Sequence, residues 1–283
     1  MTAGHSIRKA TRVCGVNRST FGYRTRPRTP GNREIRRLLL TDSIGQVHDD
    51  SRGTYGYRRV QATLRIERDL IVNHKLVAQV MAELGLEGLP TRKSRKRNLV
   101  SVRTTSDLVK RNFSVTGPNQ LWVTDITEHP TREGLVYACV VLDAFSRKAV
   151  GWAIDRKAET ALVNSALYMA WSTRETTRDS IIHADHGTQF TSWAFTNNVD
   201  TYGLRLSLGT VGDCYDNAMI ESFWGRMQTE LLDRKKWLTI MELSTAMADY
   251  IDHFHNTQRR HSSLDMLTPT EYEQVHAPVL QLT

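Results

Sequence analysis

Hydrophobic and polar positions follow two different patterns along the chain, and the pattern changes near residue 120. Before that point, the segments 34–50, 55–69 and 72–88 carry apolar residues at intervals of three and four, which is typical of amphipathic helices. In the third segment, Asn73 is placed to cap the start of the helix and Gly85 to end it. The front of the chain is therefore predicted to be helical, with two further short helices nearer the N-terminus.

After residue 120, the apolar residues are often β-branched and form short runs. The runs 120–130, 135–146 and 148–156 predict three consecutive strands joined by turns, in antiparallel order. Further along, a helix, a strand, a helix, a strand and a helix are predicted over 159–171, 180–185, 193–203, 204–209 and 213–232. This order predicts an α/β fold with a mixed five-stranded sheet, helices on its faces and the first and fourth strands adjacent. A long helix over 239–256 is expected to follow.

Composition limits the class of protein. The 283 residues are 40% hydrophobic and 24% charged, which suits one main domain and a smaller one. No apolar run approaches the roughly 20 residues that span a bilayer, and the N-terminus shows no secretory signal. The three cysteines are far apart and form no CxxC pair, so neither a disulfide framework nor a zinc ribbon is indicated. We expect a cytoplasmic protein that does not bind membranes.

Charge is distributed unevenly. Residues 1–120 hold 24 Lys and Arg against 9 Asp and Glu, whereas residues 121–283 hold 14 against 21, within a net charge of +8. The basic half suits a polyanion, because neutralised phosphates release their counterions. The acidic half suits a metal site. The alternative for the basic half is a solvated surface without a partner.

The helical region before residue 90 is compatible with a helix-turn-helix. Its outward-facing basic residues are expected to be Arg58, Arg59, Arg65 and Lys75. A small helical hairpin without DNA-binding function would show the same pattern. The segment 91–115 has little periodicity and is predicted to be a basic linker that lies along phosphates or serves only as a flexible tether. Its candidate DNA contacts are Arg92, Lys93, Arg95, Lys96 and Arg97.

Three acidic residues stand out by their positions. Asp125 interrupts an apolar strand, Asp185 follows the end of a later strand, and Glu221 lies at the flank of the apolar stripe of a helix. If the first and fourth strands are neighbours, the three carboxylates can meet. Clustered carboxylates repel one another, and hard divalent cations such as Mg²⁺ relieve the repulsion. Two such ions support in-line displacement at phosphorus in nucleases, polymerases and strand-transfer enzymes.

Other polar and aromatic residues are given structural roles. Asp143 is expected to order the DAFSR turn, and Asp213 and Asp216 to cap the helix that carries Glu221. His253 and His255 face different sides of a helix and make a poor metal pair. Packing is also expected for Trp122, Trp152, Trp171 and Trp224, and for Tyr55 and Tyr57, for which stacking on a base is the alternative.

The strings LWVTDITEHP, VVLDAFSRKAVGWAI, IIHADHGTQFTS, GDCYDNAMIESFWGRMQTEL and FHNTQRRHSSLDMLTPTEYE resemble, in order and spacing, the second-frame (OrfB-like) transposase of the IS-three family of bacterial insertion sequences. The resemblance continues upstream through GTYGYRRVQATLR and VAQVMAELGLEG and covers essentially the whole chain. It implies an RNase H-like core of the retroviral-integrase type, with a DDE metal-binding triad at Asp125, Asp185 and Glu221 and two Mg²⁺ or Mn²⁺ ions. Helix-turn-helix segments would precede this core.

The resemblance also implies contacts around the triad. Gly187 would let the backbone approach the site, Gln189 would touch DNA, and Asn217 would support Glu221. Arg259 and His261, which with Asn256 match the family's Asn-x-x-Arg-x-His pattern, would contact the DNA backbone or brace the core.

The sequence departs from the family pattern at two places. Glu128 and His129 replace an aromatic and an apolar residue, which puts an extra acid near the site. Gln228 replaces the Lys that often lies seven residues after the catalytic Glu, so a DNA contact there is weakened or moved. Arg226 lies about 140° from Glu221 around the helix and is a poor substitute.

The expected domains are a helical N-terminal segment (1–30), a helix-turn-helix-like region (31–90), the basic linker (91–115), the catalytic core (116–235) and a C-terminal helix with a basic tail (236–283). The resemblance implies DNA strand cleavage and transfer at insertion-sequence ends, by a homo-oligomer on double-stranded DNA in the bacterial cytoplasm, associated with the nucleoid. The upstream-frame protein or a frameshift fusion is a further expected partner, since the chain shows no leucine heptad run. The alternatives are a catalytically silent DNA-binding regulator and a hydrolytic nuclease of the same fold.

Overall fold

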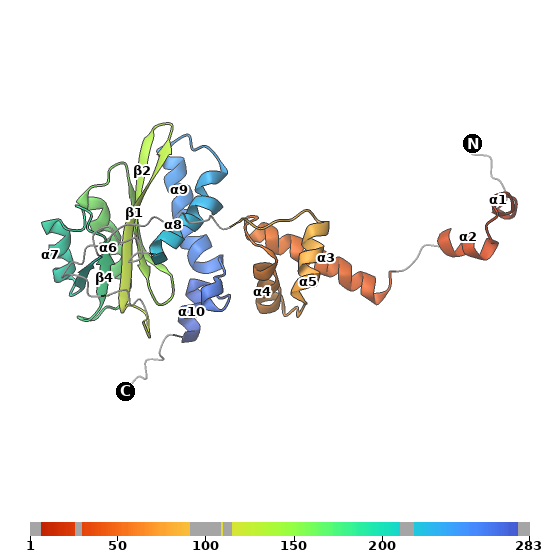
Figure 1. Ribbon diagram of the computed structural model, residues 1–283, viewed down its shortest axis with the longest axis horizontal. Helices are drawn as coiled ribbons and strands as arrows, with labels where there is room; N and C mark the ends of the chain where they lie inside the picture. The colour runs from red at the N-terminus through yellow and green to blue at the C-terminus, as the bar shows by residue number, and fades with distance from the viewer. Residues whose placement is uncertain (1–6, 26–29, 91–108, 110–114, 210–217, 277–283) are drawn as a thin grey trace, which may run out of the picture.

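A computed structural model of the chain describes residues 7–25, 30–90, 109, 115–209 and 218–276 (Figure 1). The basic residues at 92–97 and Asn217, Asp213 and Asp216 lie outside these ranges. Within them, no helix is both long enough and apolar enough to cross a membrane.

The front of the chain is helical, as its periodicity predicts. Helices α1 (Ile7–Val13) and α2 (Arg18–Thr25) flank a turn, and α3 (Asn32–Asp50), α4 (Tyr57–Arg68) and α5 (His74–Glu83) pack around a separate small core. The side chain of Asn73 accepts a hydrogen bond from the backbone N–H of Lys75 (2.8 Å) and caps α5. Gly85 follows the helix with φ +67°, a left-handed conformation that favours glycine. Both sequence-predicted ends of α5 are confirmed.

The second half contains one mixed sheet of five strands. These are β1 (Leu121–Thr131), β2 (Gly134–Asp143), β3 (Ala149–Asp155), β4 (Ile181–Ala184) and β5 (Arg205–Leu208), in the order β3-β2-β1-β4-β5. The first three strands are antiparallel, whereas β1 pairs with β4 and β4 with β5 in parallel. The predicted mixed sheet is confirmed, including the adjacency of the first and fourth strands.

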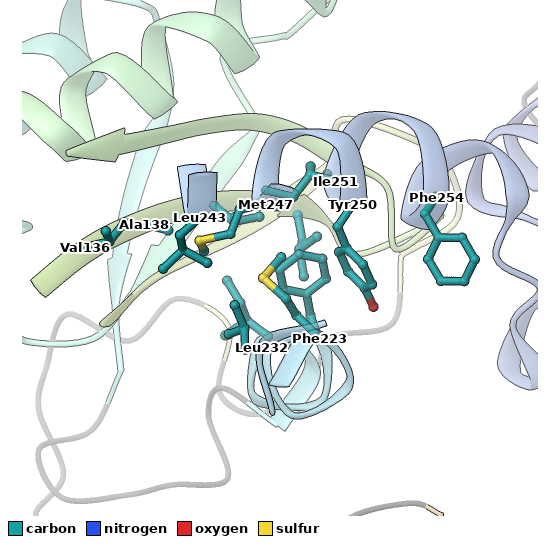
Figure 2. Close-up of a cluster of buried hydrophobic side chains, with 14 of the residues drawn as sticks. Val136, Ala138, Phe223, Leu232, Leu243, Met247, Tyr250, Ile251 and Phe254 are labelled. Carbon is teal, nitrogen blue, oxygen red and sulfur yellow. The ribbon is translucent and has the colours of Figure 1, made fainter. Parts of the chain in front are cut away.

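Helices cover both faces of the sheet because β2 is apolar on both sides (Figure 1). Cys139 and Val141 face α6 (Thr160–Thr173) and α7 (Trp193–Thr201). The alternate positions Val136, Ala138 and Val140 face the opposite core. Figure 2 shows that core between β2, α8 (Ala218–Glu230), α9 (Ile240–Asp249) and η2 (Tyr250–Gln258).

The C-terminal helix differs from its expected form. It begins at Ile240, as predicted, but from Tyr250 to Gln258 it continues as a π-helix, whose hydrogen bonds span one more residue than those of an α-helix. A short 3₁₀ helix, η3 (Ser262–Leu264), and an α-helix, α10 (Pro269–His276), follow η2. Another short 3₁₀ helix, η1 (Leu232–Arg234), follows α8. Apolar periodicity of three and four does not distinguish an α-helix from a π-helix over nine residues.

The α3–α5 bundle lies against the C-terminal helices (Figure 1). The hydroxyl of Tyr55 donates to the carbonyl of Gln258 (2.9 Å) and accepts from the backbone N–H of Arg260 (2.6 Å). The Arg260 side chain pairs with Glu67 of α4 and Glu271 of α10. Tyr55 therefore packs as expected, but against the catalytic half as well as within its own helical bundle.

A buried ion pair fixes the C-terminal end of α8. Glu230 accepts two hydrogen bonds from Arg259 (2.7 and 2.6 Å) and one from the hydroxyl of Tyr250 (2.8 Å). Arg59 of α4 approaches the same carboxylate at 3.8 Å. Burial alone would raise the pKa of Glu230, but the hydrogen bonds and charge of Arg259 hold it below its usual value. One carboxylate thus joins α8, η2 and the α3–α5 bundle.

Replacing Glu230 with Gln, or Arg259 with Met, should lower the free energy of unfolding by about 3–5 kcal/mol, because each change leaves a buried charge unpaired. Arg37→Gln is the matched control, since its pair with Glu83 is exposed and should contribute less than about 1 kcal/mol. Urea denaturation of the three variants measures both effects. If the buried-pair variants and Arg37→Gln lost equal amounts of unfolding free energy, the buried pair would not be the stronger contributor to stability.

Candidate active site

The sheet register brings two of the three acids to neighbouring positions. Val123 of β1 pairs with His183 of β4 in parallel, and Asp125 and Asp185 each follow two residues later. Side chains two residues apart on a strand share a face, and neighbouring strands lie about 4.8 Å apart, so both carboxylates extend from the same edge region of the sheet. Both line a cavity of about 280 Å³, together with Thr127, Glu128 and Gln189 among others.

Asp125 is the most perturbed acid of this site. Burial in the centre of the sheet, with repulsion from Asp185 and Glu221, raises the pKa of Asp125 to about 7. Hydrogen bonds from the backbone N–H of Ile126 and from Trp224 counteract the shift only in part. The carboxylate is therefore held in a place that disfavours its charge unless a cation is present.

Helix α8 brings the third acid to the same region. Glu221 lies in its first turn, and burial raises the pKa of this carboxyl. One turn later, the indole N–H of Trp224 donates to Asp125 (3.2 Å). This contact fixes α8 against β1. The sequence assigned Trp224 to packing alone, although its i+3 spacing from Glu221 places both residues on one side of the helix.

The loop after β4 is shaped around Asp185. The backbone N–H of Gly187 donates to the Asp185 carboxylate (2.9 Å). A Cβ at Gly187 would lie 2.9 Å from the same oxygen, so a side chain at this position would displace the Asp185 carboxylate. The Gln189 amide N–H₂ donates to the carbonyl of Ala158 (2.8 Å), and Gln189 lines the cavity.

The chemistry of the donor set matches a hard divalent cation, since all three acids offer oxygen ligands. Among the residues that the structure describes, no three His, Cys, Asp or Glu side chains are grouped closely enough to hold a metal ion. Asp125 nevertheless feels the charges of both Asp185 and Glu221.

The expected DNA contacts of the front half divide into two groups. Arg58 and Lys75 are exposed on α4 and α5. Arg59 instead faces the core half, where its guanidinium lies over the ring of Tyr55 and near Glu230. The prediction that Arg59 faces outward is wrong, because the α3–α5 bundle packs on the core through that side of α4.

The C-terminal candidates are buried. Arg259 and His261 are each 1% exposed, so neither side chain reaches the surface to contact DNA. Arg259 pairs with Glu230, and Asn256 bonds both backbone groups of Ala149 (2.9 Å each). Of the two roles expected for this motif, the structure favours bracing of the core and contradicts direct DNA contact in this conformation. Gln228 is partly exposed and donates to Asp233.

Several structural roles are confirmed. Asp143 accepts from the backbone N–H groups of Asn119 (2.7 Å) and Phe145 (2.8 Å), and so orders the turn after β2. His255 is buried and His253 exposed, on different sides of η2. Trp122 is 1% exposed and packs as expected, whereas Trp171 is 38% exposed and stacks on Tyr202 at the surface of α6.

A mixed sheet in this order, with one acid on β1, one just after β4 and one on a following helix, defines an RNase H-like core of the integrase and transposase class. Models of the integrase core domain match residues 115–214 and 202–269, and a model of an HTH-like domain matches residues 34–94. The chain belongs to the IS-three family of insertion-sequence transposases, as a second-frame, OrfB-like member with a DDE-type core.

Relatives cover nearly the full chain. The transposase for insertion sequence element IS904 of Lactococcus lactis is 31% identical over 88% of this chain and 99% of its own length. The putative transposase for element IS986/IS6110 of Mycobacterium tuberculosis is 35% identical over 87% and 91%. Among solved structures, the HTLV-2 integrase catalytic core domain in complex with magnesium is similar, with 20% identity and a TM-score of 0.43 over 56% of this chain and 97% of that chain.

Replacing Asp125 with Asn should stabilise the metal-free protein at neutral and alkaline pH. The pKa of Asp125 is about 7 in the folded chain, against about 3.9 when unfolded. The wild type therefore loses stability relative to the variant as pH rises from about 4 to about 7, and the difference stays constant above that. Urea denaturation in EDTA across this pH range measures it. Asp200→Asn on the exposed side of α7 is the control, and equal pH profiles for both variants would contradict the prediction.

Proposed function

We propose that this chain catalyses divalent-metal-dependent cleavage and strand transfer at the ends of an insertion sequence, with Asp125, Asp185 and Glu221 as its catalytic and metal-binding residues. The observation that carries the proposal is the parallel β1–β4 register beside α8, which sets Asp125 next to Asp185 and near Glu221. Membership of an insertion-sequence transposase family supports the reaction class.

The chain's own residues would prepare the site. Two Mg²⁺ or Mn²⁺ ions would supply activation of the attacking oxygen and stabilisation of the leaving oxygen during in-line displacement at phosphorus. Trp224 holds the Asp125 carboxylate in a fixed orientation, and Gly187 does the same for Asp185. Gln189, on the rim of the same cavity, would position a DNA strand.

Cleavage and joining would follow one after the other at this site. Hydrolysis of a phosphodiester at the end of the element frees a 3′-hydroxyl, and that oxygen then attacks a phosphodiester of the target. A new phosphodiester forms as the target's own 3′-oxygen leaves, so no protein–DNA bond is needed. We infer that a homo-oligomer on double-stranded DNA brings two ends together in the cytoplasm, at the nucleoid, with the upstream-frame protein or fusion as a further partner.

DNA would be held by surfaces on both halves. Arg58 and Lys75 are exposed and free of acidic partners among the described residues, which suits phosphate contacts by the helix-turn-helix-like bundle. Gln228 on the Glu221 helix would add a contact nearer the active site, and Asn217 and the basic residues at 92–97 would add further contacts.

Substitution of each acid should abolish joining without abolishing DNA binding. Asp125→Asn, Asp185→Asn and Glu221→Gln should each reduce Mg²⁺-dependent joining of labelled element ends by about a thousandfold, since loss of a metal ligand removes several kcal/mol of transition-state stabilisation. Asp200→Asn should leave the rate unchanged. Wild-type joining in any of the three acid variants would refute its assignment.

The products distinguish the alternatives. A hydrolytic nuclease would give nicked ends and no joined DNA, and a silent regulator would bind DNA without cutting it. Mapping product ends on labelled DNA, with Mg²⁺ and with EDTA, separates these outcomes from strand transfer.

The proposed phosphate contacts of Arg58 and Lys75 can be tested by substitution. Arg58→Gln with Lys75→Gln should weaken binding to duplexes of any sequence and lower the slope of log K against log salt by about two, because two phosphate contacts are lost. Arg37→Gln, whose side chain is paired with Glu83, should leave the slope unchanged. Fluorescence anisotropy at several salt concentrations measures both, and an unchanged slope in the double variant would exclude these two contacts.

A further inference from the structure

A second cavity lies on another side of α8 from the acids. It has a volume of about 360 Å³ and lies between the first half of α8, the turn after β2, and η2. Its polar lining comes from Arg147, Ser222, Arg226, His255 and Ser263. We call it the Arg147–Arg226 pocket. Ser222 directly follows Glu221, so the pocket adjoins the turn of α8 that carries the third acid.

The charge of this pocket is unbalanced. Arg147 and Arg226 both line it, and none of the described residues in its wall is acidic. Within the described part of the chain, neither guanidinium forms a salt bridge, in contrast to Arg259 and Arg174. Both arginines are partly buried, and burial lowers the pKa of each, for Arg226 to about 10 with help from Arg259 and Arg59. Two cations that share a cavity without an acid leave a site for an anion.

His255 of η2, which also lines the pocket, supports the binding of an anion there. Burial, with repulsion from Arg259 and Arg226, lowers the pKa of His255 to about 3. Its Nε2 donates to the carbonyl of Arg147 (2.8 Å), which leaves Nδ1 as a buried ring atom without a partner among the described residues. An anion beside the ring would favour the protonated form, and Nδ1–H would then be a donor.

We propose that the Arg147–Arg226 pocket binds one phosphate of the DNA backbone. Two guanidiniums and two serine hydroxyls offer the donors that a phosphodiester accepts, and the volume of the pocket admits the group. The contact rests on the DNA strand transfer proposed above and would hold a strand on the far side of the helix that presents Glu221.

Neutralising the pair tests the proposal in the full-length chain. Arg147→Gln and Arg226→Gln should each weaken binding to a linear duplex of arbitrary sequence by about tenfold, as expected for a lost charged hydrogen bond. The double variant should lower the slope of log K against log salt by about one, because both arginines serve a single phosphate. Arg147→Lys with Arg226→Lys should retain the slope. Arg178→Gln, an exposed residue between α6 and β4, is the matched control.

A second measurement does not need DNA. Inorganic phosphate should raise the melting temperature of the wild type and of Arg178→Gln, but not of the double Gln variant. A phosphate effect combined with wild-type DNA binding in the double variant would assign the pocket to a free anion and overturn the DNA contact. A slope that falls by about two would likewise overturn a single shared phosphate.

The outcome separates this contact from the proposed function. If the wild type joins DNA ends and the double variant binds DNA as tightly as the wild type, the pocket proposal fails and strand transfer stands. If the wild type joins no ends but the double variant loses affinity and slope as stated, the pocket proposal stands and the catalytic assignment fails.

Discussion

The burial of Asp125 in the centre of the sheet, near the carboxylates of Asp185 and Glu221, is the constraint around which the catalytic half is organised. The sheet pairs β1 on both sides, which buries Asp125 and raises its pKa to about 7. The acids come from separate elements, and the main chain and Trp224 hold two of them in place without neutralising them. Under the function proposed above, a divalent cation would reverse the sign of these interactions and draw the three carboxylates together. The fold therefore keeps Asp125 in a place where its charge is disfavoured, and either a proton or a bound cation would relieve it.

Helix α8 links the site around Asp125 to the rest of the molecule. Its first turn carries Glu221, its middle contacts Asp125 through Trp224, and its last residue, Glu230, accepts from Arg259. Because Arg59 also approaches Glu230, the position of the α3–α5 bundle and the position of the third acid depend on one helix. The contacts of Glu230 with Arg259 and Arg59 thus help to fix the helical bundle relative to the catalytic half.

The sequence predicts local order well here and side-chain partners less well. Alternation and turn residues predicted all five strands, and the β1–β4 adjacency followed from the order of elements. The π-helical form of η2 was not predictable, since the apolar spacing there fits either helix. The inward orientation of Arg59, and the choice between DNA contact and core bracing for Arg259 and His261, were not predictable, because their pairing with Glu230 or their burial joins segments far apart in the chain. The hydrogen bond from Trp224 to Asp125 was not predictable, because apolar periodicity indicates which residues are buried but not which acceptor an indole N–H finds.

The basic tail shows why net charge is a poor guide to where DNA binds. Arg259 is paired with Glu230, and Arg260 is paired with Glu67 and Glu271. Each arginine therefore adds less to the positive surface potential than its formal charge suggests. Their charge is still felt locally, since Arg259 helps to lower the pKa values of Arg226 and His255. Arg147 and Arg226, which line the pocket beside α8, have no such acidic partner among the described residues. If the pocket holds a backbone phosphate as proposed, α8 would lie between that contact and the acids of the proposed active site.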